Sequence, residues 1–555
     1  MAKNFSVSLI HNNSVISSVD SDKSLKISDL ISKFPDSNKV VAVKINNTIN
    51  SLDTVVDYNS TVEPIYINTK DGMIIYRRTL CLILSAAAKK LFPSKRFIVG
   101  HSICHSNYYT IFGQNQISQE EIDSLKKEMQ WIIEQKLPIE TKLIPYADAI
   151  ELFTKQNMKE SLEQLRLNCP PLVKICSIGD FSDLQFQTLL ANSAQIHSFD
   201  LIKYENGMLL RFPRTSSPYA LREFIDEPKL FKTYKHYNDW GERVGVTSVS
   251  DLNKLIINRK INDFIDISET HQQKCIADIA EQIIESKKVR VVLIAGPSSS
   301  GKTTTSKKLA LELMANGYKS KIISLDCYYL GRDKTPRDKN GELDFECLEA
   351  LNIDLLNQNL INLFDGKEVI IPSYDFKVGM PFFEESNKMS LEENEFLILE
   401  GIHGLNDKLT PKIPNELKFK LYISALTQLN LNDSNRISTK DNRLIRRIVR
   451  DAGFRGKSAS GTIKMWPSVL RGEELHIYPF HNNADAILNT ALDYELSVLR
   501  VYAEPILRCV PPTQKEYSEA QRLLKFLENF STIPPTAIPP RSILREFIGG
   551  SAFKY

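Results

Sequence analysis

The chain has few cysteines for its length, and none of them stand in a C-x-x-C pair. Eight cysteines are spread over 555 residues, from Cys81 to Cys509. A chain this long can bury several hydrophobic cores without covalent cross-links. A disulfide-stapled secreted module is therefore excluded, and free thiols in a reducing cytoplasm are the expectation.

The sequence also lacks a strong charge of one sign and a long hydrophobic run. The formal net charge is only +3, which implies no overall attraction to nucleic acid or to an anionic membrane. The longest apolar stretch, around Leu80 to Ala88, is too short to cross a bilayer. Residues Met1 to Phe5 lack the apolar core of a signal peptide. We therefore expect a cytoplasmic protein that makes no membrane contact.

One segment has a strong motif, G-x-x-x-x-G-K-[ST], which is the phosphate-binding P-loop. An apolar, β-branched run, Val289–Ala295, precedes it and predicts a buried strand, and Thr305–Leu313 has the pattern of a helix. The loop amides and the positive helix end would hold the phosphates of ATP, with GTP as the alternative. Lys302 would reach the β- and γ-phosphates, and the Thr303 hydroxyl would bind Mg²⁺. The predicted ATP-binding residues of the loop are Gly296, Pro297, Ser298, Ser299, Ser300, Gly301, Lys302, Thr303 and Thr304.

Two acidic residues end apolar strands in the same region. Asp326 follows Ser320–Leu325, and Glu400 ends the strand that begins at Phe396. Ligands of open α/β sheets bind at the carboxyl ends of the strands, where an acid accepts a hydroxyl proton or holds Mg²⁺. The alternative is a helix cap or a strand-end acid without a role, and the nearby P-loop favours function.

Basic residues cluster after residue 440, and their spacing of three or four places several of them on one helix face. The cluster consists of Arg443, Arg446, Arg447, Arg450, Arg455 and Lys457. Only Asp441 and Asp451 lie near enough in sequence to neutralise it. Because arginine binds phosphate oxygens in pairs, we interpret this helix as a lid over the transferred phosphate. An RNA-binding helix is the alternative.

Between the two acids lie weaker candidates for substrate binding. Glu346 offers a carboxylate for sugar hydroxyls, and Tyr374 offers a ring on which a base can stack. No N-K-x-D motif follows the P-loop, and the one D-x-x-G, Asp338–Gly341, lies in a charged loop. These absences argue against a GTPase and favour a P-loop kinase with a small hydroxyl substrate.

Taken together, these residues resemble the phosphoribulokinase/uridine kinase family. The segments that carry the resemblance are Gly296–Thr304, Ser324–Tyr329, Tyr374–Phe376, Glu400–Ile402 and Arg443–Asp451. The resemblance implies that Asp326 activates the 5′-hydroxyl of a nucleoside, that Glu346 binds the sugar and that Tyr374 stacks on the base. It also implies lid positions at Arg447, Arg450, Arg455 and Lys457, with Arg447 and Lys457 near the substrate. The chain departs from uridine–cytidine kinases in having Lys377–Gly379 in place of a base-reading histidine, and Lys457 in place of an arginine.

The N-terminal half resembles threonyl-tRNA synthetase. Residues 1–68 look like its TGS domain, a small β-grasp, and residues 69–213 look like its α+β editing domain. The editing motif H-x-x-x-H is replaced by Arg78 and Leu82, so we expect the editing chemistry to be absent.

The predicted organisation is multidomain. A connecting region at 214–285 follows the synthetase-like half, an α/β P-loop kinase domain with a parallel sheet spans 286–510, and 511–555 form a proline-rich tail with one short helix. The expected activity is ATP- and Mg²⁺-dependent phosphorylation of a nucleoside, uridine or cytidine, in pyrimidine salvage. The alternatives are a regulator that senses nucleotide and binds RNA or tRNA through the N-terminal half, and a kinase of another small hydroxyl compound. The oligomeric state stays open, with a homo-oligomer among the options.

Overall fold

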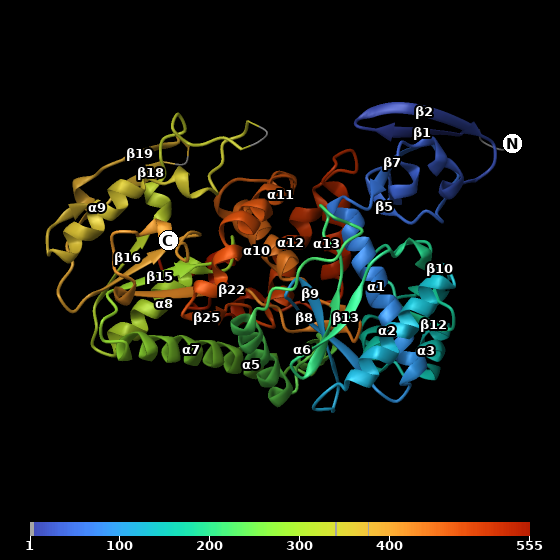
Figure 1. Cartoon of the computed structure of the whole chain (residues 1–555), viewed down its shortest axis with the longest axis horizontal. Helices are drawn as coiled ribbons and strands as arrows, with labels where there is room; N and C mark the ends of the chain where they lie inside the picture. The colour runs from blue at the N-terminus through green and yellow to red at the C-terminus, as the bar shows by residue number, and fades with distance from the viewer. Residues whose placement is uncertain (1–4, 339–340, 376, 555) are drawn as a thin grey trace.

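The computed structural model describes residues 5–338, 341–375 and 377–554. The chain is elongated, with the N-terminal half at one end and the P-loop region at the other (Figure 1). Phe376, within the tyrosine–aspartate–phenylalanine segment, and Lys339 and Asn340, within the D-x-x-G segment, lie outside the described residues. None of the described helices combines the length and the apolar character that crossing a membrane requires.

The first region is a five-stranded sheet with the order β2-β1-β7-β4-β5, in which β1 and β7 are parallel and the other pairs antiparallel. Phe5, Val7 and Leu9 alternate toward its core, as the sequence pattern predicts. A short 3-10 helix, Ile27–Lys33, packs against this sheet. That this sheet is a β-grasp stays a prediction. The strands are β1 Phe5–His11, β2 Ser14–Ser21, β4 Val40–Ile45, β5 Thr48–Asn50 and β7 Ser60–Tyr66.

A long helix, α1 (Lys70–Leu91), connects the first sheet to the second region. Its N-cap Thr69 accepts a hydrogen bond from the Gly72 amide. The helix is buried on most sides, because residues of the first sheet and of the second region share one core with it. Two antiparallel sheets, β13-β14-β9-β8 and β10-β11-β12, complete this region with three further helices. The elements are β8 Phe97–Ile103, β9 Ser106–Ile111, α2 Gln119–Glu134, β10 Ile139–Pro145, α3 Tyr146–Lys155, α4 Lys159–Asn168, β11 Leu172–Ile178, β12 Phe181–Leu184, β13 Asp200–Tyr204 and β14 Gly207–Arg211.

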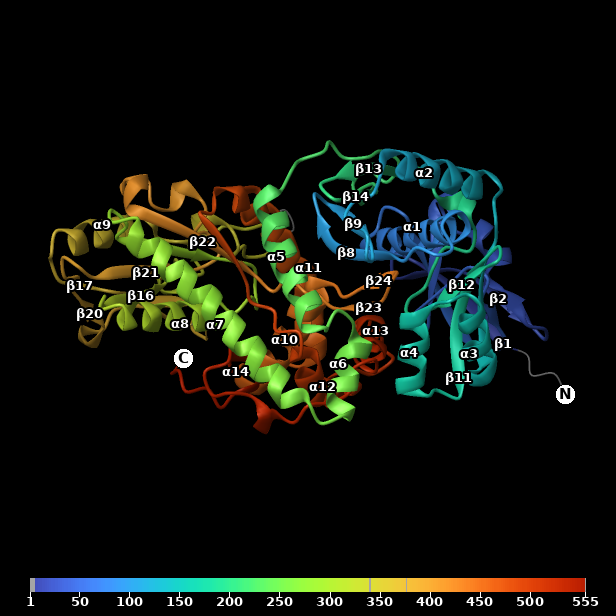
Figure 2. The same ribbon diagram turned by 90° about the horizontal axis from the view of Figure 1, so that it is seen from below.

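Three helices, α5 (Pro228–Val244), α6 (Val249–Ile257) and α7 (Ile261–Glu285), form the connection to the P-loop. Helix α7 runs along the underside of the P-loop sheet (Figure 2), and its Ile276 and Ile279 share a core with Leu309 of the helix after the P-loop.

The P-loop region is an α/β domain built on a sheet of five parallel strands, in the order β16-β21-β15-β22-β25. Val292 and Ile294 of β15 face α7 and α8, whereas Val291 and Leu293 face α9. Both faces of the sheet are therefore covered, which explains why its strands are continuous apolar runs. The predicted parallel sheet is confirmed. Its elements are β15 Val291–Ala295, α8 Lys302–Ala315, β16 Ser320–Ser324, α9 Ile353–Phe364, β21 Phe396–Glu400, β22 Lys418–Ser424 and β25 Ala486–Asn489.

The C-terminal helices pack beside this sheet in one large core, which the proline-rich tail joins. The tail's predicted short helix is α14, and its Phe547, with Ile543 and Leu544 just before it, is fully buried. The chain end then returns to α8, where the Lys307 ammonium donates a hydrogen bond to the Lys554 carbonyl. The helices are α10 Thr439–Phe454, α11 Ala459–His476, α12 Glu495–Arg508, α13 Tyr517–Leu527 and α14 Arg545–Ile548.

A small hairpin, β23 (Asn430–Asn432) and β24 (Asn435–Arg436), ties the P-loop region to the N-terminal half just before α10. The Asn432 amide donates to the buried carboxyl of Asp183 (3.0 Å), and Arg96 pairs with Asp433 (2.7 Å). Arg78, which the resemblance predicts to stand at the position of the first editing histidine, donates to the Asn435 side chain (3.2 Å). Arg78 thus contacts the hairpin that leads into the arginine-rich helix.

Candidate active site

The P-loop has the tight backbone that phosphate binding requires. A Cβ at Gly296 would lie 2.2 Å from the Ile423 carbonyl oxygen, so only glycine fits there. Ser299 (φ 60°) and Gly301 (φ 88°) adopt left-handed conformations that turn the chain into α8. Lys302 Nζ folds back along the loop and donates to the carbonyls of Gly296 (3.0 Å) and Pro297 (3.3 Å). The ammonium and the amides at the start of α8 therefore border the same concave loop.

Two predicted acids lie beside the loop. The Thr303 hydroxyl donates to Glu400 Oε1 at 3.3 Å, and Glu400 is 7% exposed. Burial raises the pKa of Glu400 to about 7, opposed by Lys302 and reinforced by the Asp326 charge. Asp326 sits in the 3-10 turn Leu325–Tyr328 after β16. Desolvation by the surrounding protein raises the pKa of Asp326 against the opposing charges of Lys302, Arg455 and Arg450.

These donors fit a magnesium ion. Thr303, Asp326 and Glu400 offer only oxygen atoms, which Mg²⁺ prefers, and Mg²⁺ takes few carboxylates because phosphates and water fill its other positions. Glu400 is a buried carboxyl held partly protonated by desolvation, so a cation beside it would favour the ionised form. These residues would hold the ion against the Thr303 side of the loop.

Of the two predicted substrate-binding residues Glu346 and Tyr374, Glu346 faces the charges around the P-loop. Burial raises the pKa of Glu346 to about 7, with a smaller contribution from Glu473, while Arg447 and Lys302 oppose the shift. The Glu346 side chain packs on Gly472 of α11, where an added Cβ would lie 2.5 Å from Glu346 Cβ. Tyr374 lies on the short strand β18 (Ser373–Asp375), and the centroid of its ring is 5.6 Å from that of Tyr329. Tyr329 in turn follows Asp326 by three residues.

The arginine-rich helix is only partly what the sequence predicts. Arg443 and Arg446 are fully buried, so they do not belong to a lid over the phosphate. Arg443 pairs with Glu473 and donates to the Ser298 carbonyl (2.9 Å). Arg446 pairs with Glu495 and donates to the Ser299 carbonyl (3.3 Å). The neutralising acids come from α11 and α12 rather than from the helix itself, and these two guanidinium groups support the P-loop from behind.

The other basic residues divide into two groups. Arg447 donates to the Ser298 hydroxyl (2.7 Å), and Arg450 lies near Asp326 with a pKa lowered by burial to about 10, so it stays protonated at neutral pH. Arg455 is half exposed, and its charge also lowers the pKa of Asp326. Lys457 is exposed and donates to Met465 Sδ (3.4 Å), so it is not among the residues that the structure brings to the loop.

Sequence reasoning missed two residues that contact the P-loop or its helix, Glu473 and Glu546, and one buried histidine near the end of β21, His403. Glu473 accepts a hydrogen bond from the Ser298 amide (3.2 Å). Glu546 of α14 accepts hydrogen bonds from the Thr304 amide (3.2 Å) and hydroxyl (2.6 Å) and lies 4.0 Å from Arg450. His403, just after Glu400, is buried, and burial lowers its pKa to about 4. Only His403 had a sequence signal, its place directly after the β21 strand end, since the two glutamates are distant in the chain.

A parallel α/β sheet with a P-loop at the end of its central strand, two strand-end acids and arginines around it defines the class of P-loop phosphotransferases. Residues 291–497 match the model of the Phosphoribulokinase / Uridine kinase family, so the similarity of this chain to that family lies in its P-loop region. The match supports the use of ATP together with Mg²⁺, and it gives no support for GTP.

Curated relatives match the two halves separately. A uridine kinase of Macrococcus caseolyticus is 28% identical over 195 residues, 35% of this chain and 81% of the relative. A threonine–tRNA ligase of Lawsonia intracellularis is 29% identical over 212 residues, 36% of this chain, and the N-terminal region carries this similarity. The chain spans only 32% of that ligase.

Solved structures are less similar. One titled a possible uridine kinase from Bacillus stearothermophilus has a TM-score of 0.25 and 17% identity, over 41% of this chain and all of that one. Phosphoribulokinase from Rhodobacter spheroides has a TM-score of 0.24 and 17% identity, over 36% of this chain and 69% of the other.

Proposed function

We propose that this protein transfers the γ-phosphoryl group of ATP to the 5′-hydroxyl of a nucleoside, with uridine or cytidine as the expected substrate. The observation that carries the proposal is that Asp326 directly follows β16, which pairs with β21, and that Glu400 at the end of β21 accepts a hydrogen bond from Thr303 of the P-loop helix (3.3 Å). The phosphate-binding loop and the two strand-end acids therefore lie at the same edge of the sheet. The uridine kinase relatives support the same substrate class.

Each residue has a role that follows from its chemistry. Lys302 and the loop amides hold the β- and γ-phosphates, and bound Mg²⁺ would neutralise charge on their oxygens. The hydroxyl oxygen of the nucleoside bonds to the γ-phosphorus of ATP while Asp326 accepts the hydroxyl proton. The bond between the γ-phosphorus and the bridging oxygen breaks, and ADP leaves. The pKa of Asp326 is raised above the usual aspartate value and so lies closer to neutral pH, where a general base works best. Arg447 and Arg450 stabilise the charge on the transferred group.

Glu346 and Tyr374 would bind the nucleoside. Glu346 would accept hydrogen bonds from ribose hydroxyls, and the paired rings of Tyr374 and Tyr329 would provide a face for the base. The resemblance puts Lys377–Gly379 where uridine–cytidine kinases have a base-reading histidine, so on this proposal a different residue contacts the base.

A second candidate function concerns the N-terminal half. Because the β23–β24 hairpin binds to this half and leads directly into α10, a ligand there could change the position of Arg447 and Arg450. We propose RNA or tRNA as that ligand on the strength of the synthetase similarity. Salt-dependent tRNA binding that changes kinase activity would support this role, and the absence of binding at low salt would exclude it.

The test is ATP consumption by the purified protein against a panel of nucleosides. Turnover with uridine or cytidine that Asp326→Asn abolishes would establish a pyrimidine nucleoside kinase. Turnover with another hydroxyl compound would keep the reaction and change the substrate. Lys302→Ala should abolish turnover without changing the circular dichroism spectrum, and substantial activity in this variant would refute the P-loop assignment.

A further inference from the structure

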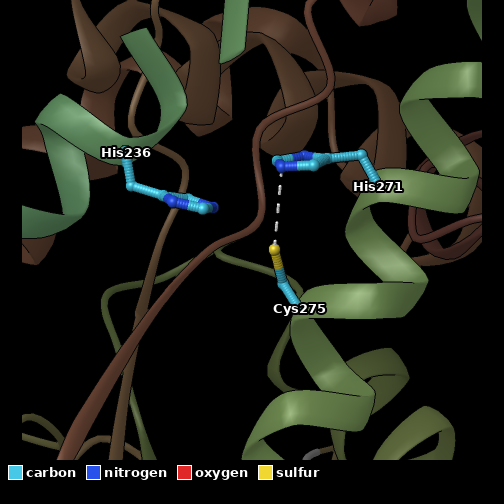
Figure 3. Close-up of side chains that lie close together, drawn as sticks. All are labelled: His236, His271 and Cys275. Carbon is cyan, nitrogen blue, oxygen red and sulfur yellow. Dashed lines mark hydrogen bonds between the residues drawn. The ribbon is translucent and has the colours of Figure 1, made fainter. Parts of the chain in front are cut away.

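Away from the P-loop, three side chains with metal-binding atoms meet between α5 and α7. They are His236 of α5 and His271 and Cys275 of α7, and their ligand atoms all lie within 4.8 Å of one another. Within the described ranges of the chain, no other trio of histidine, cysteine or acidic residues comes this close. In Figure 3 the side chains from the two helices turn toward the same space.

The helices fix this arrangement. His271 and Cys275 are four residues apart and therefore share one face of α7, with Nε2 and Sγ 4.0 Å apart. On α5, Trp240 lies one turn after His236, and its ring stacks on His271 with centroids 4.5 Å apart and an angle of 15°. Trp240 thus holds the His271 ring in place, while His236 is exposed and can rotate.

Zinc binds the neutral ring of a histidine and the thiolate of a cysteine. The Cys275 thiol therefore gives up its proton to solvent when its sulfur binds the cation.

We propose that His236, His271 and Cys275 bind one Zn²⁺ ion. Two imidazole nitrogens and one thiolate suit zinc and do not suit Mg²⁺ or Ca²⁺, which prefer oxygen. Zinc bonds of about 2.0 Å to nitrogen and about 2.3 Å to sulfur place tetrahedral ligand atoms roughly 3.3–3.7 Å apart. Rotation of His236 and small shifts on α7 close the remaining gap of about 1 Å, and water takes the fourth position.

The ion would join two helices of the connecting region, α5 and α7. Helix α7 shares its core with α8, the helix that follows the P-loop, so the ion would fix α5 to the helix that packs on the P-loop domain. This site is independent of the phosphate-binding residues, and its test does not depend on the proposed kinase activity.

The experiment uses the metal-free full-length protein and Co²⁺ as a spectroscopic probe for zinc. We expect one Co²⁺ per chain, a thiolate-to-cobalt charge-transfer band, and loss of that band when Zn²⁺ is added. Cys275→Ser should remove the band. His236→Ala, at an exposed position, should weaken binding by at least about tenfold, since even loss of an outer contact to a ligand costs that much.

Cys169→Ser is the matched control, because Cys169 is an exposed free cysteine outside the cluster. It should bind Co²⁺ as the wild type does. Zn²⁺ should raise the melting temperature of the wild type and the control, but not that of Cys275→Ser. The proposal is overturned if the wild type shows no thiolate band, if Cys275→Ser keeps the band, or if His236→Ala binds with wild-type affinity. Equal melting temperatures of the metal-free variants will show that each is folded.

Discussion

The Glu546 carboxylate is hydrogen-bonded to donors at the start of the P-loop helix that a bound phosphate would otherwise use. Its carboxylate accepts from both the amide and the hydroxyl of Thr304, in the first turn of α8, and it lies 4.0 Å from Arg450. Helix N-termini bind one anion well, so the carboxylate and a nucleotide phosphate compete for the same donors. We therefore expect Glu546→Gln to bind ATP more tightly than the wild type.

The contacts set the size of the effect. Hydrogen bonds to a charged acceptor contribute about 1.5–3 kcal/mol, and neutral ones are about half as strong. Replacing the carboxylate with an amide should thus weaken the competing contact by about 1–2 kcal/mol, roughly a five- to thirtyfold gain in nucleotide affinity. The Glu546 side chain is only 10% exposed, so salt should screen the effect little.

The assay is calorimetric titration with a non-hydrolysable ATP analogue and Mg²⁺, which reports binding without turnover. Glu528→Gln is the control, since Glu528 is an exposed acid at the end of α13. Unchanged or weaker binding by Glu546→Gln would refute the reasoning, because the carboxylate would then not compete with the phosphates.

Two further predictions concern buried charges. The folded state holds the pKa of Glu400 at about 7, above the ordinary glutamate value, so its contribution to stability is complete below about pH 4.5 and is lost as pH rises through 7. Glu400→Gln should therefore stabilise the metal-free protein by about 3 kcal/mol at pH 8 and change little at pH 5, as thermal unfolding at the two pH values will show; equal effects at both would contradict the shift. Arg446→Ala leaves Glu495 buried without its partner and should cost about 3–5 kcal/mol, whereas Arg455→Ala, at a half-exposed site, should lower kcat with little effect on Tm. Equal melting temperatures of these two variants would show that Arg446 does not support the fold.

Much of the P-loop domain was predictable because local sequence fixes it. The buried strands β15 and β21 are apolar runs that end at Ala295 and Glu400, and the glycines of the loop stand where only glycine fits. Such signals need no knowledge of distant residues. Strand-end acids also meet at one sheet edge in any parallel sheet, which is why Asp326 and Glu400 were found.

The role of the arginines was not predictable from spacing. Helical periodicity places Arg443, Arg446, Arg447 and Arg450 near one another, but it does not say which side of the helix faces solvent. Glu473 and Glu495 neutralise the first two from helices that follow later in the chain. Lys457 lies close in sequence to Arg455, yet the loop directs it away from the site.

The sequence alone thus determined the phosphate-binding loop, the parallel sheet around it and the two strand-end acids, because each depends on residues that are neighbours in the chain or on a rule common to all such sheets. Only the tertiary structure decided that Glu546 contacts the P-loop helix, that the β23–β24 hairpin binds the N-terminal half, and that His236 lies close to His271 and Cys275. Those contacts join residues far apart in sequence or on different helices, and the packing of whole elements, rather than any local pattern, brings them together.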